Sequence, residues 1–145
     1  MARSNVRKSG KRSGFEEKVG KQLDDAGMEY TYETYSYEYE APLRKNRSRC
    51  LECGSTSLVR EAWYTPDFFL KNGKIIEAKG RFTAANRRLI LAVRECHPEL
   101  EENLLMFFMR DNKIHKSSDT TYSMWCEANG VPYAVGPDLP KEWLT

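Results

Sequence analysis

The chain lacks a long apolar run. No stretch of its 145 residues approaches the roughly 20 consecutive apolar residues that cross a membrane. It also lacks the apolar region of a signal peptide near residue 1, and no segment of it is repeated. We therefore expect no membrane association and a cytoplasmic protein whose four cysteines are reduced or bound to metal.

The charge is nearly balanced but unevenly placed. Hydrophobic residues make up 40% and charged residues 30% of the chain, which is typical of a folded soluble domain. The net charge is only +2. Two basic clusters stand out, one before the first acid (Arg3, Arg7, Lys8, Lys11, Arg12) and one in a polar segment (Arg44, Lys45, Arg47, Arg49). They indicate a polyanionic partner, although a solubilising tail and a solvated loop would look the same.

The apolar pattern predicts one domain over residues 13–145, after a flexible basic tail at 1–12. Helices are expected at about 13–27, 83–95 and 121–128, with a helical turn at 139–144. Strands are expected at 28–40 (interrupted near Thr34), on both sides of a turn in 64–80, at 104–109 with a possible partner at 113–115, and at 131–135. Residues 41–62 are interpreted as a cysteine-containing loop or insertion. This order predicts an α/β fold with a mixed sheet.

The turn at Asn72-Gly73 decides where two acids point. A two-residue loop would place Asp67 and Glu77 on opposite faces of the hairpin. A three-residue loop with Gly73 in a left-handed conformation would pair Asp67 with Glu77 and put both on the face of Lys79. The two alternatives differ by one residue of register, and only the second creates a site.

Paired acids in a sheet repel each other, and burial increases the cost. The segments around them, "DFFL" and "KIIEA", are apolar on both parities, which indicates a strand covered on both faces rather than solvated acids on an open sheet. Lys79 alone balances two carboxylates poorly, whereas Mg²⁺ prefers carboxylate oxygens. Such a metal site beside a lysine suggests phosphodiester hydrolysis.

Glu16 is a third candidate. Ser13 and Glu16 have the spacing of a capping box, in which the glutamate bonds back to the first amide of the helix. The alternative is a helix-borne carboxylate that reaches metal ions held by the hairpin. We expect one rotamer to serve only one of these roles.

Pro66-Asp67 followed by Glu77-Ala78-Lys79 resembles the motif of the phage endonuclease I family of Holliday-junction resolvases, within the PD-(D/E)xK nuclease superfamily. The similarity continues in family order outside 42–63, through "RSGFEEKVGKQL", "YTPDFFL", "NGKIIEAKG", "RECHPEL", "WCEANGVPYA" and "LPKEWL".

The resemblance implies a restriction-endonuclease-like mixed sheet flanked by helices, in an intertwined homodimer that exchanges strands. It implies metal-dependent cleavage of four-way junctions and other branched DNA, with about two Mg²⁺ or Mn²⁺ per site. Glu16, Asp67, Glu77 and the carbonyl of Ala78 would be metal ligands, and Lys79 the catalytic lysine. The setting would be the cytoplasm of a bacterial host if the protein is phage-encoded.

DNA contacts are expected from basic residues of the tail, the polar segment and the end of the hairpin: Arg3, Arg7, Lys8, Lys11, Arg12, Arg44, Lys45, Arg47 and Arg81. The chain departs from the family in two places. Thr31 stands where the family has a supporting glutamate, for which Glu33 is a possible substitute. The segment 42–63 is also longer than the family pattern, so the bridge between subunits is expected to differ.

Cys50 and Cys53 have the spacing of one zinc knuckle, which supplies two of four ligands. The rest would come from Cys96, His97, His115 and Cys126, or from the same pair in a second subunit; otherwise the pair forms a reduced or oxidation-prone loop. Cys96 and Cys126 occupy apolar helix positions and are expected to be small core residues. The knuckle and the tail leave two alternatives to an enzyme: a non-catalytic DNA-binding module and a zinc-bridged structural dimer.

Overall fold

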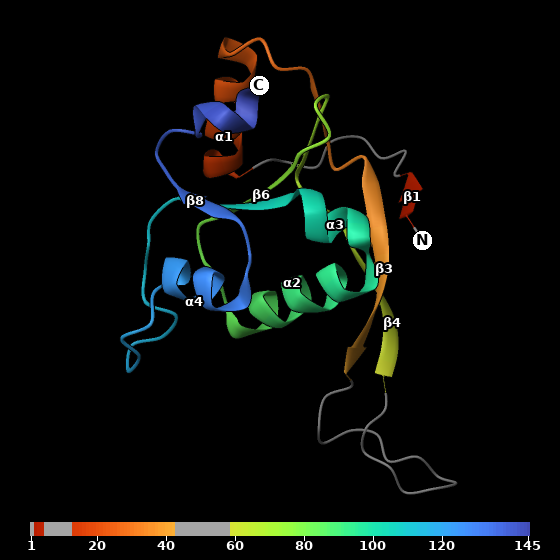
Figure 1. Ribbon diagram of the computed structural model, residues 1–145, viewed down its shortest axis with the longest axis vertical. Coiled ribbons are helices and arrows are strands. Elements are labelled where there is room, and N and C mark those ends of the chain that lie inside the picture. The colour runs from red at the N-terminus through yellow and green to blue at the C-terminus, as the bar shows by residue number, and fades with distance from the viewer. Residues whose placement is uncertain (1, 5–12, 43–58) are drawn as a thin grey trace, which may run out of the picture.

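The computed structural model describes residues 2–4, 13–42 and 59–145 (Figure 1). A five-stranded sheet has the order β2 (Tyr30–Tyr32), β5 (Phe68–Leu70), β6 (Ile75–Lys79), β7 (Leu104–Phe108) and β8 (Tyr133–Val135). A three-stranded sheet has the order β1 (Ala2–Ser4), β3 (Tyr35–Pro42) and β4 (Val59–Tyr64). The helices are α1 (Gly14–Asp25), α2 (Ala84–Cys96), α3 (Pro98–Asn103), α4 (Tyr122–Asn129) and the 3₁₀ turn η1 (Lys141–Leu144). The predicted mixed α/β class is confirmed.

The five-stranded sheet is covered on both faces. In its centre β5 and β6 are antiparallel, whereas β6, β7 and β8 run parallel. Figure 1 shows α1 and η1 on one side of this sheet and α2 and α4 on the other. All five residues of β7 are buried, and alternate ones join two different cores. This arrangement explains the continuous apolar run of β7 and leaves the hairpin little contact with solvent.

Local sequence sets the limits of α1. Ser13 is the N-cap, and Glu16 completes the predicted capping box. The apolar residues that follow at helical spacing, Phe15, Val19 and Leu23, are all buried. Gly27 stops the helix with a φ of +71°, a conformation that costs glycine little.

The tyrosine-rich segment divides between the two sheets. Glu33 has a φ of +50°, and its N–H donates to the carbonyl oxygen of Asp67 at 2.8 Å. The chain leaves β2 here and enters β3 in the other sheet. The predicted break near Thr34 is therefore a change of sheet, and it accounts for the switch in the parity of the tyrosines.

The hairpin has the register of the three-residue loop. Phe69 lies opposite Ile75, and the N–H of Leu70 donates to the carbonyl oxygen of Lys74 at 2.9 Å. Gly73 has a φ of +91°. Continuing this register by two residues brings Asp67 opposite Glu77, which is the alternative that creates a site.

Two strand predictions are wrong. Residues 41–62 are not wholly a loop, because β3 extends through Pro42 and β4 begins at Val59. Charged residues within "VREAWY" hide the strand pattern, and six residue pairs with β3 stabilise it instead. Residues 113–115 are not a strand either: Lys113 makes one isolated bridge to Thr121.

Two elements are not anticipated. One is α3: α2 ends at Cys96, and Pro98 occupies the first turn of a new helix, where its missing N–H costs nothing. Ala2–Ser4, expected within a flexible tail, form β1 and pair with β3. The described residues contain no helix that is long and apolar enough to cross a membrane.

We predict that Gly73→Ala lowers the free energy of unfolding by about 1–2 kcal/mol, measured by urea denaturation. An added Cβ would meet nothing within 4 Å, so the loss reports the left-handed backbone alone. Gly14→Ala is the matched control, because its Cβ also meets nothing within 4 Å and Gly14 lies in the first turn of α1. The control is expected to be neutral or stabilising, and equal losses in both variants would contradict the assignment.

Candidate active site

The hairpin carries two buried carboxylates and a lysine. Asp67, just before β5, is 6% exposed, and Glu77 in β6 is 3% exposed. The side chain of Lys79, two residues along the same strand, is 27% exposed. The register gives the three side chains the same parity, and Lys79 is the most exposed of the three.

Each carboxylate is held by the backbone of the opposite strand. The N–H of Ala78 donates to Oδ2 of Asp67 at 2.9 Å, and the N–H of Asp67 donates to Oε2 of Glu77 at 3.2 Å. The same Oε2 accepts the hydroxyl of Tyr64 at 2.8 Å. Oε1 of Glu77 faces Nζ of Lys79 at 3.0 Å. Both acids are thereby fixed in orientation.

Burial dominates the electrostatics of the acids. Together with the nearby charges of Glu77 and Glu16, it raises the pKa of Asp67 to about 9. Burial also raises the pKa of Glu77, against the effect of Lys79 and of the hydrogen bonds from Tyr64 and Asp67. The cluster is therefore short of positive charge.

Lys79 is held in its charged form. Burial alone would lower its pKa, but the charge and hydrogen bond of Glu77, with Asp67 and Glu16 beyond, raise it above the ordinary value. A lysine in this state donates hydrogen bonds and neutralises negative charge, and it is a poor base at neutral pH.

Glu16 reaches the hairpin and caps its helix in one rotamer. Its Oε2 accepts the N–H of Ser13 at 2.7 Å, and its own N–H donates to Oγ of Ser13 at 3.2 Å. The same carboxyl group lies within hydrogen-bonding reach of Asp67 and of the hydroxyl of Tyr32. The cap and the approach to the hairpin coexist in one rotamer, because a carboxylate has two oxygens. That capping excludes metal binding stays a prediction.

Two tyrosines of the site are missed by the sequence analysis. Tyr64 donates to Glu77, and Tyr32 contacts Glu16. In the sequence both look like ordinary strand residues. The available signal was that a buried tyrosine needs a partner for its hydroxyl, and Tyr64 stands three residues before Asp67. Burial, with the charge of Glu77, keeps the pKa of Tyr64 well above its ordinary value, so its hydroxyl is a donor.

The donor chemistry fits a divalent metal ion. Three carboxylates share one lysine, and hard cations such as Mg²⁺ take carboxylate oxygens. Among residues 13–42 and 59–145, however, no three acids, histidines or cysteines stand as a ready-made metal cluster. The contacts give the reason: Glu77 Oε1 is paired with Lys79, and Glu16 Oε2 with the Ser13 amide. A metal ion bound here would share these oxygens with their present partners or replace those partners.

The zinc candidates do not converge within the described part of the chain. Nε2 of His97 donates to the carbonyl oxygen of Glu38 at 2.6 Å, and Nδ1 of His115 is 3.0 Å from Oγ of Ser117. Cys126 is a buried core residue, as predicted, but Cys96 is exposed because it ends α2 at the surface. Cys50 and Cys53 lie outside the described residues.

The basic residues are described only in part. Arg81 is exposed two residues after Lys79, at the edge of the site. Arg3 belongs to β1. The other expected DNA contacts lie outside the described residues: Arg7, Lys8, Lys11, Arg12, Arg44, Lys45 and Arg47.

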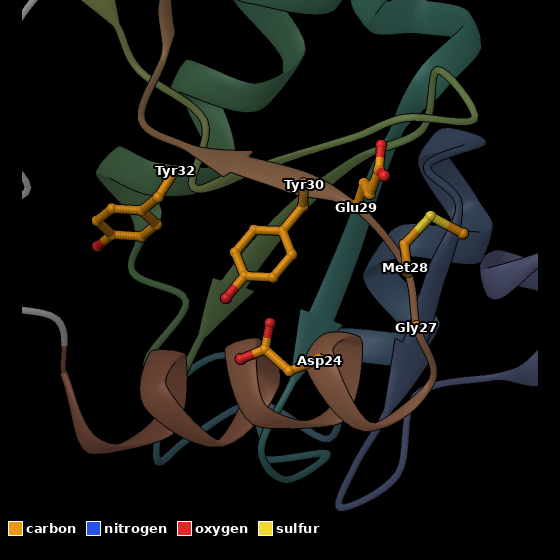
Figure 2. A pocket seen from close by; sticks show the side chains of 6 residues that line it. All are labelled: Asp24, Gly27, Met28, Glu29, Tyr30 and Tyr32. Carbon is orange, nitrogen blue, oxygen red and sulfur yellow. The ribbon is translucent and has the colours of Figure 1, made fainter.

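An open hollow of about 530 Å³ lies between α1 and β2 (Figure 2). Tyr32 lines it and also contacts Glu16, so the hollow adjoins the carboxylate cluster. Its own acids do not converge: Figure 2 shows Asp24 on α1 and Glu29 pointing away from it. Glu29 is paired with Lys71 at 2.9 Å. The hollow is thus not the centre of the chemistry.

Buried acids and a lysine on a sheet hairpin define the class of site that hydrolyses phosphate esters with metal ions. A family model described as phage endonuclease I matches residues 55–145. "Endonuclease I" of Escherichia phage T7 is 35% identical over 140 residues, covering 96% of this chain and 82% of that protein. "Endodeoxyribonuclease 1" of Enterobacteria phage T3 is 37% identical over 123 residues, covering 85% and 70%. The chain belongs to the phage endonuclease I family, as its motifs predict.

We predict that Asp67→Asn stabilises the protein increasingly as pH rises. The folded state keeps a proton on Asp67 up to about pH 9, whereas the unfolded chain releases it near pH 3.9. Between these values each rise in pH favours the unfolded wild-type chain. In metal-free buffer, denaturant unfolding at about pH 8 should show a gain of about 1–3 kcal/mol for the variant, shrinking to nothing near pH 4. A gain independent of pH would contradict the assignment.

Proposed function

We propose that the protein is a DNA endonuclease that resolves four-way junctions and other branched DNA by metal-dependent phosphodiester hydrolysis. The observation that carries this proposal is the pair of buried acids, Asp67 and Glu77, with Lys79 at their solvent side. Two relatives named as endonucleases that cover most of this chain support the reaction class.

The acidic residues of the site bind the metal ions. Asp67, Glu77 and Glu16, with the carbonyl of Ala78, hold about two Mg²⁺ or Mn²⁺ ions. When bound, these ions polarise the phosphate and lower the pKa of a coordinated water. The carboxylates set where the ions and the scissile phosphate lie, and their burial excludes bulk water from that position.

Lys79 neutralises negative charge on the phosphate. Its pKa is raised and its Nζ faces Glu77 at the exposed side of the site. A permanent ammonium there neutralises charge that develops on the phosphate oxygens as the bond breaks. Its protonated state supports this role over that of a base that deprotonates water.

The substrate is held by basic residues around the site. Arg81 is exposed beside Lys79 and contacts the phosphate backbone. The clusters at Arg3–Arg12 and Arg44–Arg47 extend this contact to neighbouring arms of a junction. In the phage-encoded case the reaction takes place in the cytoplasm of the bacterial host.

Two sites are needed to cut two strands of a junction symmetrically, and the proposed assembly is a strand-exchanged homodimer. Light scattering after gel filtration tests the assembly: a mass near twice 16.8 kDa is expected, and a monomer at the concentration that cleaves DNA would overturn it.

We predict that Lys79→Ala reduces Mg²⁺-dependent cleavage of a labelled four-way junction by at least about 10²-fold while leaving junction binding intact. Lys71→Ala is the control, because Lys71 is on the same hairpin but its side chain is 72% exposed and paired with Glu29 at the surface. Cleavage by Lys79→Ala at the wild-type rate would overturn the proposal. Tight binding without cleavage by the wild-type protein would favour a non-catalytic DNA-binding module, which zinc analysis before and after Cys53→Ser would test further.

We predict that Arg81→Ala weakens junction binding and makes it less dependent on salt, because one phosphate contact is lost. The slope of log affinity against log salt concentration should fall by about 1 in magnitude. Lys141→Ala in η1 is an exposed control whose slope should equal that of the wild type. An unchanged slope for Arg81→Ala would show that Arg81 makes no contact with the DNA backbone.

A further inference from the structure

Tyr64 belongs to one sheet and bonds to the other. It is the last residue of β4, in the three-stranded sheet, and is 6% exposed. Its hydroxyl donates to Glu77 in the five-stranded sheet at 2.8 Å. Close by, the hydroxyls of Ser36 and Thr65 are 2.6 Å apart, which fixes the start of β3 against the chain that leaves β4. The position of Tyr64 is therefore set by strands that do not carry the acids.

The hydrogen bond selects which oxygen of Glu77 is presented. The terminal torsion of a glutamate is broad, so a carboxylate needs contacts to fix its rotation. Oε2 receives the hydroxyl of Tyr64 and the N–H of Asp67, whereas Oε1 faces Lys79. Without the hydroxyl, the single N–H at 3.2 Å would remain as the donor to Oε2.

We infer that Tyr64 is a positioning residue: its hydroxyl orients Glu77 so that Oε1 is the oxygen turned to Lys79 and to a bound divalent cation. The inference rests on the proposed metal-dependent function. Groups that orient metal-binding side chains commonly change metal affinity or activity 10–100-fold when removed. If Tyr64 orients Glu77, then Glu77 is correctly oriented as a metal ligand only when β4 lies in its place beside the five-stranded sheet.

Tyr64→Phe tests the inference, because it removes one oxygen and keeps the buried ring. Tyr37→Phe is the matched control: Tyr37 lies opposite Tyr64 in β3, is 2% exposed, and bonds through its hydroxyl to Glu99 rather than to an acid of the hairpin. Mn²⁺ binding is measured by calorimetry on the full-length protein without DNA, and thermal unfolding is recorded for both variants.

Mn²⁺ affinity should fall about 10-fold or more in Tyr64→Phe and stay at the wild-type value in Tyr37→Phe, with similar thermal shifts in the two variants. Junction binding in metal-free buffer should be unchanged in both. Wild-type affinity in Tyr64→Phe, or an equal loss in both variants, would overturn the inference alone. A wild-type protein that binds no Mn²⁺ would overturn the proposed function and this inference together.

Discussion

The burial of two carboxyl groups opposite each other on one hairpin is the constraint that shapes the rest of the structure. Asp67 and Glu77 are 6% and 3% exposed, and burial raises the pKa of both. An apolar sheet would not tolerate this pair without compensation. The backbone N–H groups of the hairpin, one tyrosine hydroxyl and one lysine provide it in part. A divalent cation would supply the rest and let both acids ionise, which is what makes the site attractive to such a cation.

The surrounding elements keep this pair in register. A slip of one residue would turn one acid to the opposite face, and Gly73 at a φ of +91° fixes the loop length that prevents it. The helices on both faces then cover the hairpin, so its strands cannot slide without exposing apolar residues. Glu16 adds a link to α1, since one carboxyl group serves both the helix cap and the acid cluster. Stability of the helix start and geometry of the site thus depend on the same side chain.

Sequence patterns predicted the elements whose signals are local. The cap of α1 and the buried strand β7 follow from residue types at fixed spacing, whereas the sequence leaves two loop lengths open at the hairpin and the register of β5 with β6 decides between them. Long-range pairing was not predictable in the same way: β4 carries two charged residues and is a strand because β3 pairs with it. Tyr64 was missed for a related reason. Nothing in its neighbours shows that its hydroxyl meets Glu77, which lies 13 residues further on and in another sheet.

The hydrogen bond from Tyr64 to Glu77 joins the two sheets, so the geometry of the site depends on the three-stranded sheet as well as on the hairpin. Asp67, Glu77 and Lys79 all belong to one hairpin, and by themselves they would form the same cluster wherever β4 lay. The hydroxyl of Tyr64 removes that independence, because Oε2 of Glu77 receives its shorter hydrogen bond from the three-stranded sheet. Correct pairing of β3 with β4 and correct orientation of a metal ligand then become one structural requirement.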